Sequence, residues 1–264
     1  MKFAYLIEPP FNYLDATGRV TGCDVELARH VFVEIGFAGF EPVETEFAEL
    51  LHGLGDGRWR MTTGLFGTDE RRKNALFSRP IWALPDGLLV ASGNPLGLSG
   101  YQSVAENSDV RLAVIRDQFQ HRSAVEFGVS ADRIMIFETY TEAARAVREG
   151  MADAYASVSR AHGGFIEQNP EWGLELILVP DSEKPPAFGS FAFGLNDADL
   201  LNDVDAVLSQ FLGTDAHRNM VASFGFSTPE VDMVAARHIK SLLWPWHAQS
   251  PLRPACRPLH EPSR

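Results

Sequence analysis

The residues with the most reactive side chains are few and scattered. The two cysteines, Cys23 and Cys256, lie far apart, so the sequence predicts neither a disulfide framework nor a CxxC metal or redox site. None of the eight histidines forms an HxH or HExxH spacing, so a zinc site would need ligands from distant parts of the chain. We therefore expect no metal and no cofactor, and we interpret both cysteines as free thiols.

A carboxylate and three aromatic rings point instead to non-covalent binding. Glu8 lies in Glu-Pro-Pro-Phe at the end of the first predicted strand, where its carboxylate can either pair with a ligand cation or cap a loop. Phe11, Phe47 and Phe66 each lie next to a strand end, and aromatic faces attract cations in a desolvated pocket. The alternative, that these rings are core residues, stays equally open for Phe47.

Composition excludes several classes of function. The 264 residues carry a formal charge of -12 without a basic cluster, which argues against nucleic acid and against an anionic membrane surface as partners. No apolar run approaches the length of a membrane span, so we expect no direct membrane insertion. The opening MKFAYLIEPPF lacks the features of a secretory signal. Either export information is missing from this chain or the protein stays in the cytoplasm.

The hydrophobic pattern alternates predicted strands and helices almost from the first residue, which indicates α/β layers with largely parallel sheets. The expected strands cover residues 2–7, 43–47, 60–66, 87–91, 111–116, 133–137, 152–157, 174–180 and 190–195. The expected helices cover residues 24–35, 48–54, 118–127, 141–149, 198–212, 215–224 and 228–243, with another after residue 157 and one starting at the Thr68 turn. Asp24 and Thr68 are the expected caps of their helices.

Turn chemistry suggests how the chain is divided. The stretch SGNP at residues 92–95, with GLSG after it, marks the start of a second βα series, and SEKPPAFGS interrupts before a return to the first unit. Residues 244–264 belong to a stretch with five prolines and little periodicity, and we expect them to be disordered.

Several segments, in order, resemble the bacterial extracellular solute-binding proteins of family 3, the periplasmic components of ABC importers for polar amino acids and ectoine. They are EPPFNY, GRVTGCDVELARHV, TTGLFGTDERRKNALFSRPI and FAFGLNDADLLNDVDAVLSQFLGTDAHRNMVASFGFS, and together they extend the resemblance over residues 1–227. No single motif is decisive, but their order and spacing are specific.

The resemblance implies a periplasmic-binding-protein-like type II fold, with two α/β lobes, a ligand cleft between them and two hinge strands. We expect residues 1–92 plus 191–243 to form lobe 1, which is discontinuous in sequence, and residues 93–190 to form lobe 2. The two crossings are expected near residues 91–95 and 188–193.

The resemblance also assigns ligand contacts in the first lobe. Arg71, in TDER, matches the carboxylate-binding arginine of the family, and a guanidinium fork binds a carboxylate with two charge-assisted hydrogen bonds. Thr63 and Gly64 are expected to offer a hydroxyl and a backbone group. An aromatic residue at Phe66, together with Glu8, resembles the ectoine-binding branch rather than the general amino-acid binders.

The second lobe departs from the family pattern at two places. Relatives carry Gly-Thr or Gly-Ser after the strand at residues 111–116, whereas this chain has Asp117 and Gln118, and an aspartate would repel a ligand carboxylate. Where amino-acid binders carry an aspartate for the ammonium group, this chain has Val158, with Ser157 beside it. An unpaired buried ammonium is costly, so the substitution favours a ligand with a diffuse or alkylated cation.

We therefore expect a monomeric solute-binding protein that delivers a small zwitterion to ABC transporter permease subunits and performs no chemistry on it. The resemblance places it in the periplasm, although no signal peptide is visible. One alternative is an enzyme similar to the cyclohexadienyl dehydratases, which share the fold and need a carboxylic acid in the cleft, for which Glu8 or Asp117 would serve. Another is an orphan cytoplasmic binding or sensor module.

Overall fold

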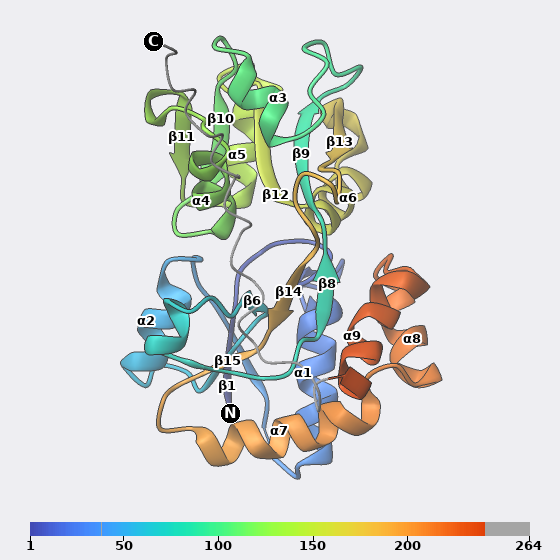
Figure 1. The fold of residues 1–264 in the computed structure, drawn as a ribbon. Coiled ribbons are helices and arrows are strands. Elements are labelled where there is room, and N and C mark those ends of the chain that lie inside the picture. Colours follow the sequence, from blue (N-terminus) through green and yellow to red (C-terminus); the bar gives the residue numbers. More distant parts are fainter. Residues whose placement is uncertain (38, 241–264) are drawn as a thin grey trace, which may run out of the picture.

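The computed structural model describes residues 1–37 and 39–240, with the side chains of residues 236–240 excluded. Two sheet-containing lobes stand one above the other and meet at a narrow waist (Figure 1). The predicted disordered segment, residues 244–264, and Cys256 lie outside the described residues.

The first lobe contains a five-stranded sheet in the order β4-β1-β5-β15-β7. These strands are β4 (Glu41–Glu44), β1 (Lys2–Tyr5), β5 (Met61–Thr62), β15 (Ala192–Phe193) and β7 (Leu76–Phe77). β1 runs parallel to β4 and β5, whereas β15 runs antiparallel to both of its neighbours. The returning strand β15 therefore joins the sheet of the N-terminal segment, as a discontinuous lobe requires.

The other elements of the first lobe are β2 (Tyr13–Leu14), β3 (Val20–Thr21), α1 (Cys23–Glu34), α2 (Glu49–Gly55), the 3-10 helix η1 (Arg71–Lys73), α7 (Ala198–Phe211), α8 (Asp215–Ala222) and α9 (Thr228–Lys240).

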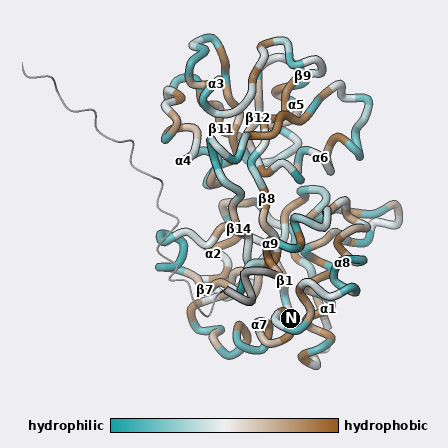
Figure 2. Tube along the Cα trace, turned by 45° about the vertical axis from the view of Figure 1, so that its right-hand side comes forward, coloured by the Kyte–Doolittle hydropathy of each residue, from teal (hydrophilic) through white to brown (hydrophobic). Residues whose placement is uncertain are grey.

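The second lobe contains the sheet β11-β10-β12-β9-β13. Its strands are β11 (Ile134–Phe137), β10 (Leu112–Ile115), β12 (Ala154–Val158), β9 (Asp86–Ala91) and β13 (Leu174–Leu178). α5 packs on β9 and β10, and α6 packs on β9 and β13. Hydrophobic stretches run mainly along the interior segments, and hydrophilic stretches lie mainly at outer loops (Figure 2). The helical elements are α3 (Tyr101–Glu106), α4 (Phe119–Glu126), η2 (Ala131–Arg133), α5 (Tyr140–Arg148), α6 (Ser159–Gln168) and η3 (Pro170–Trp172).

A third small sheet lies at the waist. Its order is β6 (Leu65–Phe66), β14 (Ala187–Ser190) and β8 (Trp82–Leu84), so both chain crossings are held to one another by backbone hydrogen bonds. The first crossing lies at Pro85, between β8 and β9, and the second lies between Val179 and β14. Both come earlier in the chain than the crossings expected near residues 91–95 and 188–193. The turn at SGNP is a connection within the second lobe, because β9 before it already pairs with β12 and β13.

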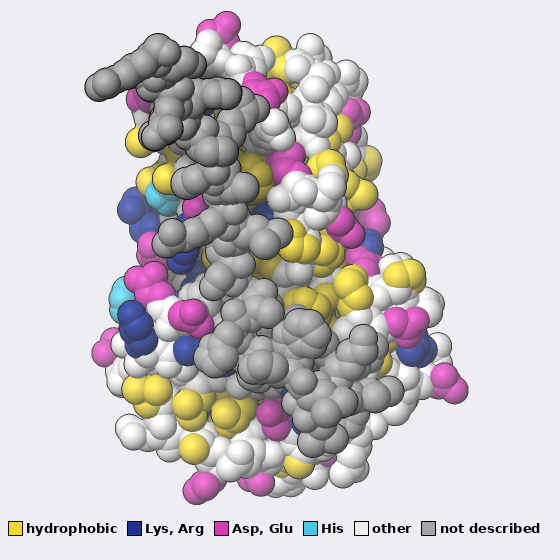
Figure 3. All heavy atoms as spheres, viewed as in Figure 1, with side chains coloured by type: hydrophobic (Ala, Val, Ile, Leu, Met, Phe, Trp, Pro, Cys, Tyr) yellow, Lys and Arg dark blue, Asp and Glu magenta, His cyan; other side chains and the backbone are white. Residues whose placement is uncertain are grey.

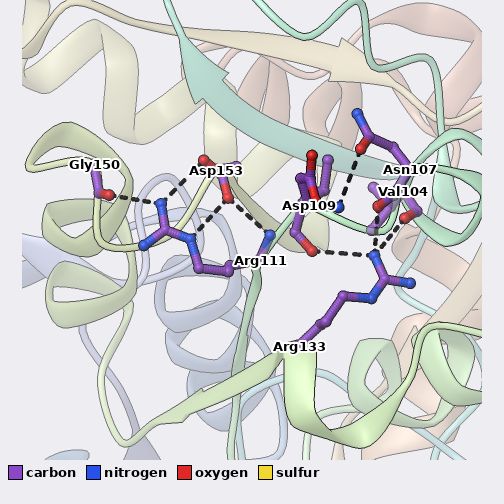
Figure 4. Close-up of polar contacts among 8 residues, drawn as sticks. Val104, Asn107, Asp109, Arg111, Arg133, Gly150 and Asp153 are labelled. Carbon is purple, nitrogen blue, oxygen red and sulfur yellow. Dashed lines mark hydrogen bonds and ion pairs between the residues drawn. The ribbon is translucent and has the colours of Figure 1, made fainter.

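Two arginines fix the outer end of the second lobe (Figure 4). Arg133 donates from Nη1 to the carbonyl oxygens of Val104, Asn107 and Val110, which satisfies backbone acceptors around the end of α3. Arg111 binds Asp153 through an exposed ion pair, with Nε 3.0 Å from Oδ2. Neither arginine lines the cleft, and their contacts lie within the second lobe, so both arginines stabilise this lobe.

The sequence pattern missed some local details. β8 and α3 were not expected, the strand predicted for residues 60–66 is split into β5 and β6, and the helix expected at Thr68 is the three-residue η1. Thr68 still accepts a hydrogen bond from the main-chain N–H of Arg71. Asp24 lies inside α1 and makes no cap, because Gly22 occupies the N-cap position and the Asp24 side chain has other partners.

Candidate functional site

A small cavity of about 40 Å³ lies between the lobes, beside the waist sheet. Nine of the ten predicted binding residues line it: Glu8, Phe11, Phe47, Thr63, Gly64, Phe66, Arg71, Gln118 and Ser157. The cavity is also lined by four residues that the sequence did not single out, which are Leu65, Trp82, Phe119 and Gln120. Val158, which stands where amino-acid binders carry an aspartate, lines the cavity as well. The tenth predicted residue, Asp117, lines an adjoining open crevice of about 620 Å³. The cavity and the crevice share five lining residues, which are Phe47, Leu65, Arg71, Gln118 and Phe119.

Asp24 organises the wall of this cavity from behind. Its side chain accepts hydrogen bonds from the Thr63 hydroxyl at 2.6 Å, the Gly64 N–H at 2.8 Å and the Trp82 indole N–H at 3.1 Å. Burial raises the pKa of Asp24, and its hydrogen-bond donors oppose that change. A buried carboxylate with several donors is well satisfied, so Asp24 fixes the positions of three lining residues.

The same network changes the role expected for Thr63. Its hydroxyl donates to Asp24 and accepts from the Asn12 side chain at 2.8 Å, so its proton is already committed. Its carbonyl oxygen accepts from the Thr62 hydroxyl. Thr63 therefore supports the wall of the cavity, and its hydroxyl oxygen keeps one lone pair as an acceptor, so the predicted contact with a ligand stays a prediction.

Trp82 lies across two glycines at the waist. A Cβ atom at Gly189 would lie 2.2 Å from the Trp82 ring, and one at Gly64 would lie 2.8 Å from it. Gly189 is also paired in register with both Trp82 and Phe66. The absence of side chains at these two positions makes room for the indole, which donates its N–H to Asp24 and lines the cavity.

Aromatic rings from both lobes surround the cavity. The Trp82 ring centroid lies 5.3 Å from that of Phe11 and 5.7 Å from that of Phe66. Phe66 also makes an edge-to-face contact with Phe119 of the second lobe, at 5.6 Å. We call Phe11, Phe66, Trp82 and Phe119 the aromatic cage. Aromatic rings attract cations through their faces, so this group of rings suits a cation with an apolar surface.

Glu8 places a carboxyl group at this cage. The residue is 9% exposed, and the Ser157 hydroxyl, from the second lobe, donates to its Oε1 at 3.4 Å. Burial, reinforced by the negative charge of Asp24, raises the pKa of Glu8 to about 7, while hydrogen bonds from Ser157 and Gln118 lower it. The carboxyl therefore titrates near neutral pH and would ionise fully beside a bound cation.

Arg71 reaches across the cleft with its guanidinium. Nη1 donates to the Phe66 carbonyl at 3.1 Å, Nη2 donates to the Asp117 carbonyl at 2.7 Å, and the group lies 5.2 Å from the Phe47 ring centroid. Burial lowers the pKa of Arg71 to about 10, so it stays charged at neutral pH. Within residues 1–37 and 39–240, no carboxylate forms an ion pair with it. A carboxylate on a ligand would supply the missing charge partner.

The strand-to-helix turn at Asp117 and Gln118 explains one departure from the family pattern. Asp117 has φ of 63°, which is the left-handed conformation that glycine adopts most easily. The aspartate therefore adopts a backbone conformation that is typical of the glycine found here in relatives. Gln118 is the N-cap of α4 and is buried, and its Oε1 has no partner in the described structure. Gln118 therefore brings an unsatisfied acceptor to the cavity wall.

Trp82 and Phe119 were missed because nothing local distinguishes them from core residues. Phe119 directly follows the predicted pair Asp117 and Gln118, so its place at a helix start was the available signal. Asp24 was interpreted as a cap, although its place in the quoted motif was a signal for a further role. The arrangement as a whole can bind a zwitterion, with a carboxylate at Arg71 and a cation between Glu8 and the aromatic cage.

Other chemistries find little support in the described part of the chain. No group of three or more histidine, cysteine or acidic side chains lies together there as metal ligands would. None of its helices combines the length and the apolar character needed to cross a bilayer. On the face shown in Figure 3, acidic and basic side chains are interspersed outside the grey atoms, without a large basic patch.

Comparisons with known proteins identify the family of the chain. The model of the bacterial extracellular solute-binding proteins, family 3, matches residues 2–225. The chain belongs to this family. The match ends before α9, so this helix lies beyond the shared region.

Individual members resemble the chain over most of its length. A Sinorhizobium fredii protein named "Probable amino-acid ABC transporter periplasmic-binding protein y4tE" is 27% identical over 89% of this chain and 80% of its own length. The arginine-binding protein ArgT of Corynebacterium glutamicum is 27% identical over 85% of this chain and 73% of its own length. Among solved structures, EhuB in complex with hydroxyectoine is 25% identical, with a TM-score of 0.80 over 89% of this chain and 90% of that one.

Proposed function

We propose that this family member is the solute-binding component of an ABC importer and binds a small zwitterion between its lobes without changing it chemically. The ligand carboxylate replaces the two carbonyl oxygens now bound by Arg71, and the ligand cation lies in the aromatic cage beside Glu8. One observation carries the proposal: a half-buried guanidinium that forms no ion pair with a carboxylate of the described residues and a buried carboxyl line the same interlobe cavity.

The cation is of the amidinium or ectoine type rather than a plain α-ammonium group. Val158 stands where amino-acid binders of the family carry an aspartate, and Glu8 is the carboxylate that lines the inner cavity of the described structure. A diffuse cation fits the flat rings of the cage, and its N–H groups can donate to Glu8. The likeness to the ectoine-type binder EhuB and to the arginine-binding protein ArgT supports this class of ligand.

The remaining features of the proposal follow from the family. Residues on both sides of the waist form two lobes that close on the ligand, and permease subunits receive it, as the names of the relatives suggest. One relative is named a periplasmic-binding protein, which supports a periplasmic location for this chain. The dehydratase alternative would use Glu8 as the acid, but the relatives named above are binding proteins, and we favour binding without catalysis.

A thermal-shift screen tests this proposal, because a ligand that binds only the folded state raises the midpoint by mass action. The panel contains ectoine, hydroxyectoine, arginine, glutamine, glycine betaine and prephenate, each measured with the wild type, Arg71→Ala and Phe66→Ser. We expect a shift with ectoines or arginine that disappears in Arg71→Ala and shrinks in Phe66→Ser. A shift that is unchanged in Arg71→Ala, or one with prephenate alone, would contradict the proposal.

A further inference from the structure

A buried ion pair lies directly behind the second-lobe side of the site. Lys184, from the second crossing, binds Asp86, at the start of β9 after the first crossing. The side chains are 12% and 1% exposed, respectively. The Asp86 carboxylate also accepts from the Tyr101 hydroxyl at 2.6 Å and from Gln120 Nε2 at 2.9 Å. The pair therefore joins the two crossings to each other and to the first turn of α4.

Lys184 also contacts Phe119, the second-lobe member of the aromatic cage. Its ammonium nitrogen lies 4.8 Å from the centroid of the Phe119 ring. It donates to the Ser123 hydroxyl at 2.8 Å, which in turn donates to the main-chain carbonyl of Phe119 at 3.3 Å. Both the ring and the backbone of Phe119 are thus held by one lysine, while the same ring meets Phe66 across the cleft.

We propose that Lys184, held by Asp86, is a positioning residue that sets Phe119 against the ligand cation, so that Phe119 determines the affinity for cations with an apolar surface. This inference rests on the proposed function for the ligand, but the position of Phe119 in the unliganded protein is independent of it. Lys184 reaches the cage from the second crossing, so the position of Phe119 depends on the arrangement of the two crossings and α4.

A double-mutant cycle tests the link between the pair and the ring. Removing Lys184 alone would leave Asp86 buried without its charge partner and endanger folding, so the pair is neutralised together as Asp86→Asn/Lys184→Met. Asparagine retains partners for Tyr101 and Gln120. We expect this variant to bind ectoine or arginine about tenfold more weakly than the wild type, as loss of a buried cation–π contact predicts.

The second arm of the cycle is Phe119→Leu, with and without the neutralised pair. If the pair acts through the ring, adding its neutralisation to Phe119→Leu produces no further loss of affinity, because coupled residues are not additive. Losses that multiply, or a neutralised pair that binds as tightly as the wild type, would overturn the inference. The control is Arg111→Met/Asp153→Asn, a more exposed ion pair of the same lobe (Figure 4) whose residues line neither the cavity nor the crevice, and it should bind like the wild type.

Fluorine NMR separates failure of this inference from failure of the proposed function. In protein labelled with 4-fluorophenylalanine, the Phe119 signal is assigned by its absence from Phe119→Leu. We expect it to shift or broaden in the neutralised pair without any ligand, and to stay unchanged in the Arg111→Met/Asp153→Asn control. An unchanged signal refutes the positioning role. If the wild type binds no compound of the panel, the proposed function fails. The fluorine signal of Phe119 still shows whether the Lys184–Asp86 pair positions this ring.

Discussion

Arg71 of the first lobe donates a hydrogen bond of 2.7 Å to the main-chain carbonyl of Asp117 in the second lobe. This contact joins the lobes directly across the cavity, and a second carbonyl, that of Phe66, takes the other arm of the guanidinium. These two acceptors are neutral, and the nearby carboxylates of Asp117 and Glu70 stabilise the Arg71 charge without forming an ion pair with it. A ligand carboxylate gains by replacing the two carbonyl acceptors, since hydrogen bonds between two ionised groups are stronger than bonds to a neutral carbonyl.

The first prediction concerns Arg71. Arg71→Ala should weaken binding of any carboxylate ligand by about 100-fold or more, because a truncated partner leaves a buried charge unpaired. Isothermal titration calorimetry with the ligand found in the screen measures the loss. Lys73→Ala is the control, since Lys73 is exposed on the same turn and does not line the cavity. A loss of the same size in both variants would show that the turn, not the guanidinium, matters.

The second prediction concerns the left-handed residue Asp117. Asp117→Gly should raise the free energy of unfolding by about 0.5–1 kcal/mol, because glycine adopts φ of 63° without steric cost. Asp117→Asn keeps a tolerant side chain while removing the charge, so it isolates the electrostatic part of any change. Urea denaturation of both variants measures the difference. A glycine variant less stable than the wild type would mean that the side chain makes a stabilising contact that outweighs its backbone strain.

The third prediction concerns Glu8 and pH. Because the pKa of Glu8 is raised from 4.5 to about 7, the folded state holds this proton more tightly than the unfolded state. Stability therefore falls as pH rises from about 4.5 through 7, by roughly 3 kcal/mol in total, and is unaffected by Glu8 below that range. Glu8→Gln should remove this decline, so the unliganded variant should be more stable than the wild type at pH 8. Thermal unfolding between pH 4 and 8 tests the difference between the two proteins.

Binding should show the opposite dependence. A ligand cation requires ionised Glu8, whose other near neighbours are the carboxylate of Asp24, the phenol of Tyr155 and the neutral Ser157 and Gln118. Affinity should therefore be roughly thirtyfold weaker at pH 5.5 than well above pH 7, given a pKa of about 7. In Glu8→Gln the affinity should be low and independent of pH over this range. A wild-type affinity that is flat with pH would argue against a cation beside Glu8.

The sequence predicted α/β layers from its hydrophobic pattern, whereas the two-lobed fold and most of the residues that line the cavity were implied by the resemblance to the solute-binding family. The spacing from Phe66 to Arg71 and the turn at Glu8 place their side chains at strand ends, where a cleft of this fold lies. The crossings were misplaced because the Gly-Asn-Pro turn after β9 is a stronger local signal than Pro85 alone. Trp82 and Phe119 could not be predicted, since their roles depend on register at the waist and on contact across the lobes.

The last prediction concerns the space that Gly189 leaves for Trp82. A Cβ atom at position 189 would lie 2.2 Å from the indole, which is buried and bonded to Asp24 and so has little freedom to move. Gly189→Ala should lower the free energy of unfolding by about 1–3 kcal/mol, as overpacking does, and should displace Trp82 from the cage, which weakens ligand binding as well.

Gly163→Ala in α6 is the matched control, because nothing lies within 4 Å of the added atom, and it should stabilise the protein slightly. Urea denaturation and calorimetry on both variants measure the two effects. If Gly189→Ala behaves like Gly163→Ala, the glycine is not what holds the indole in the cavity wall.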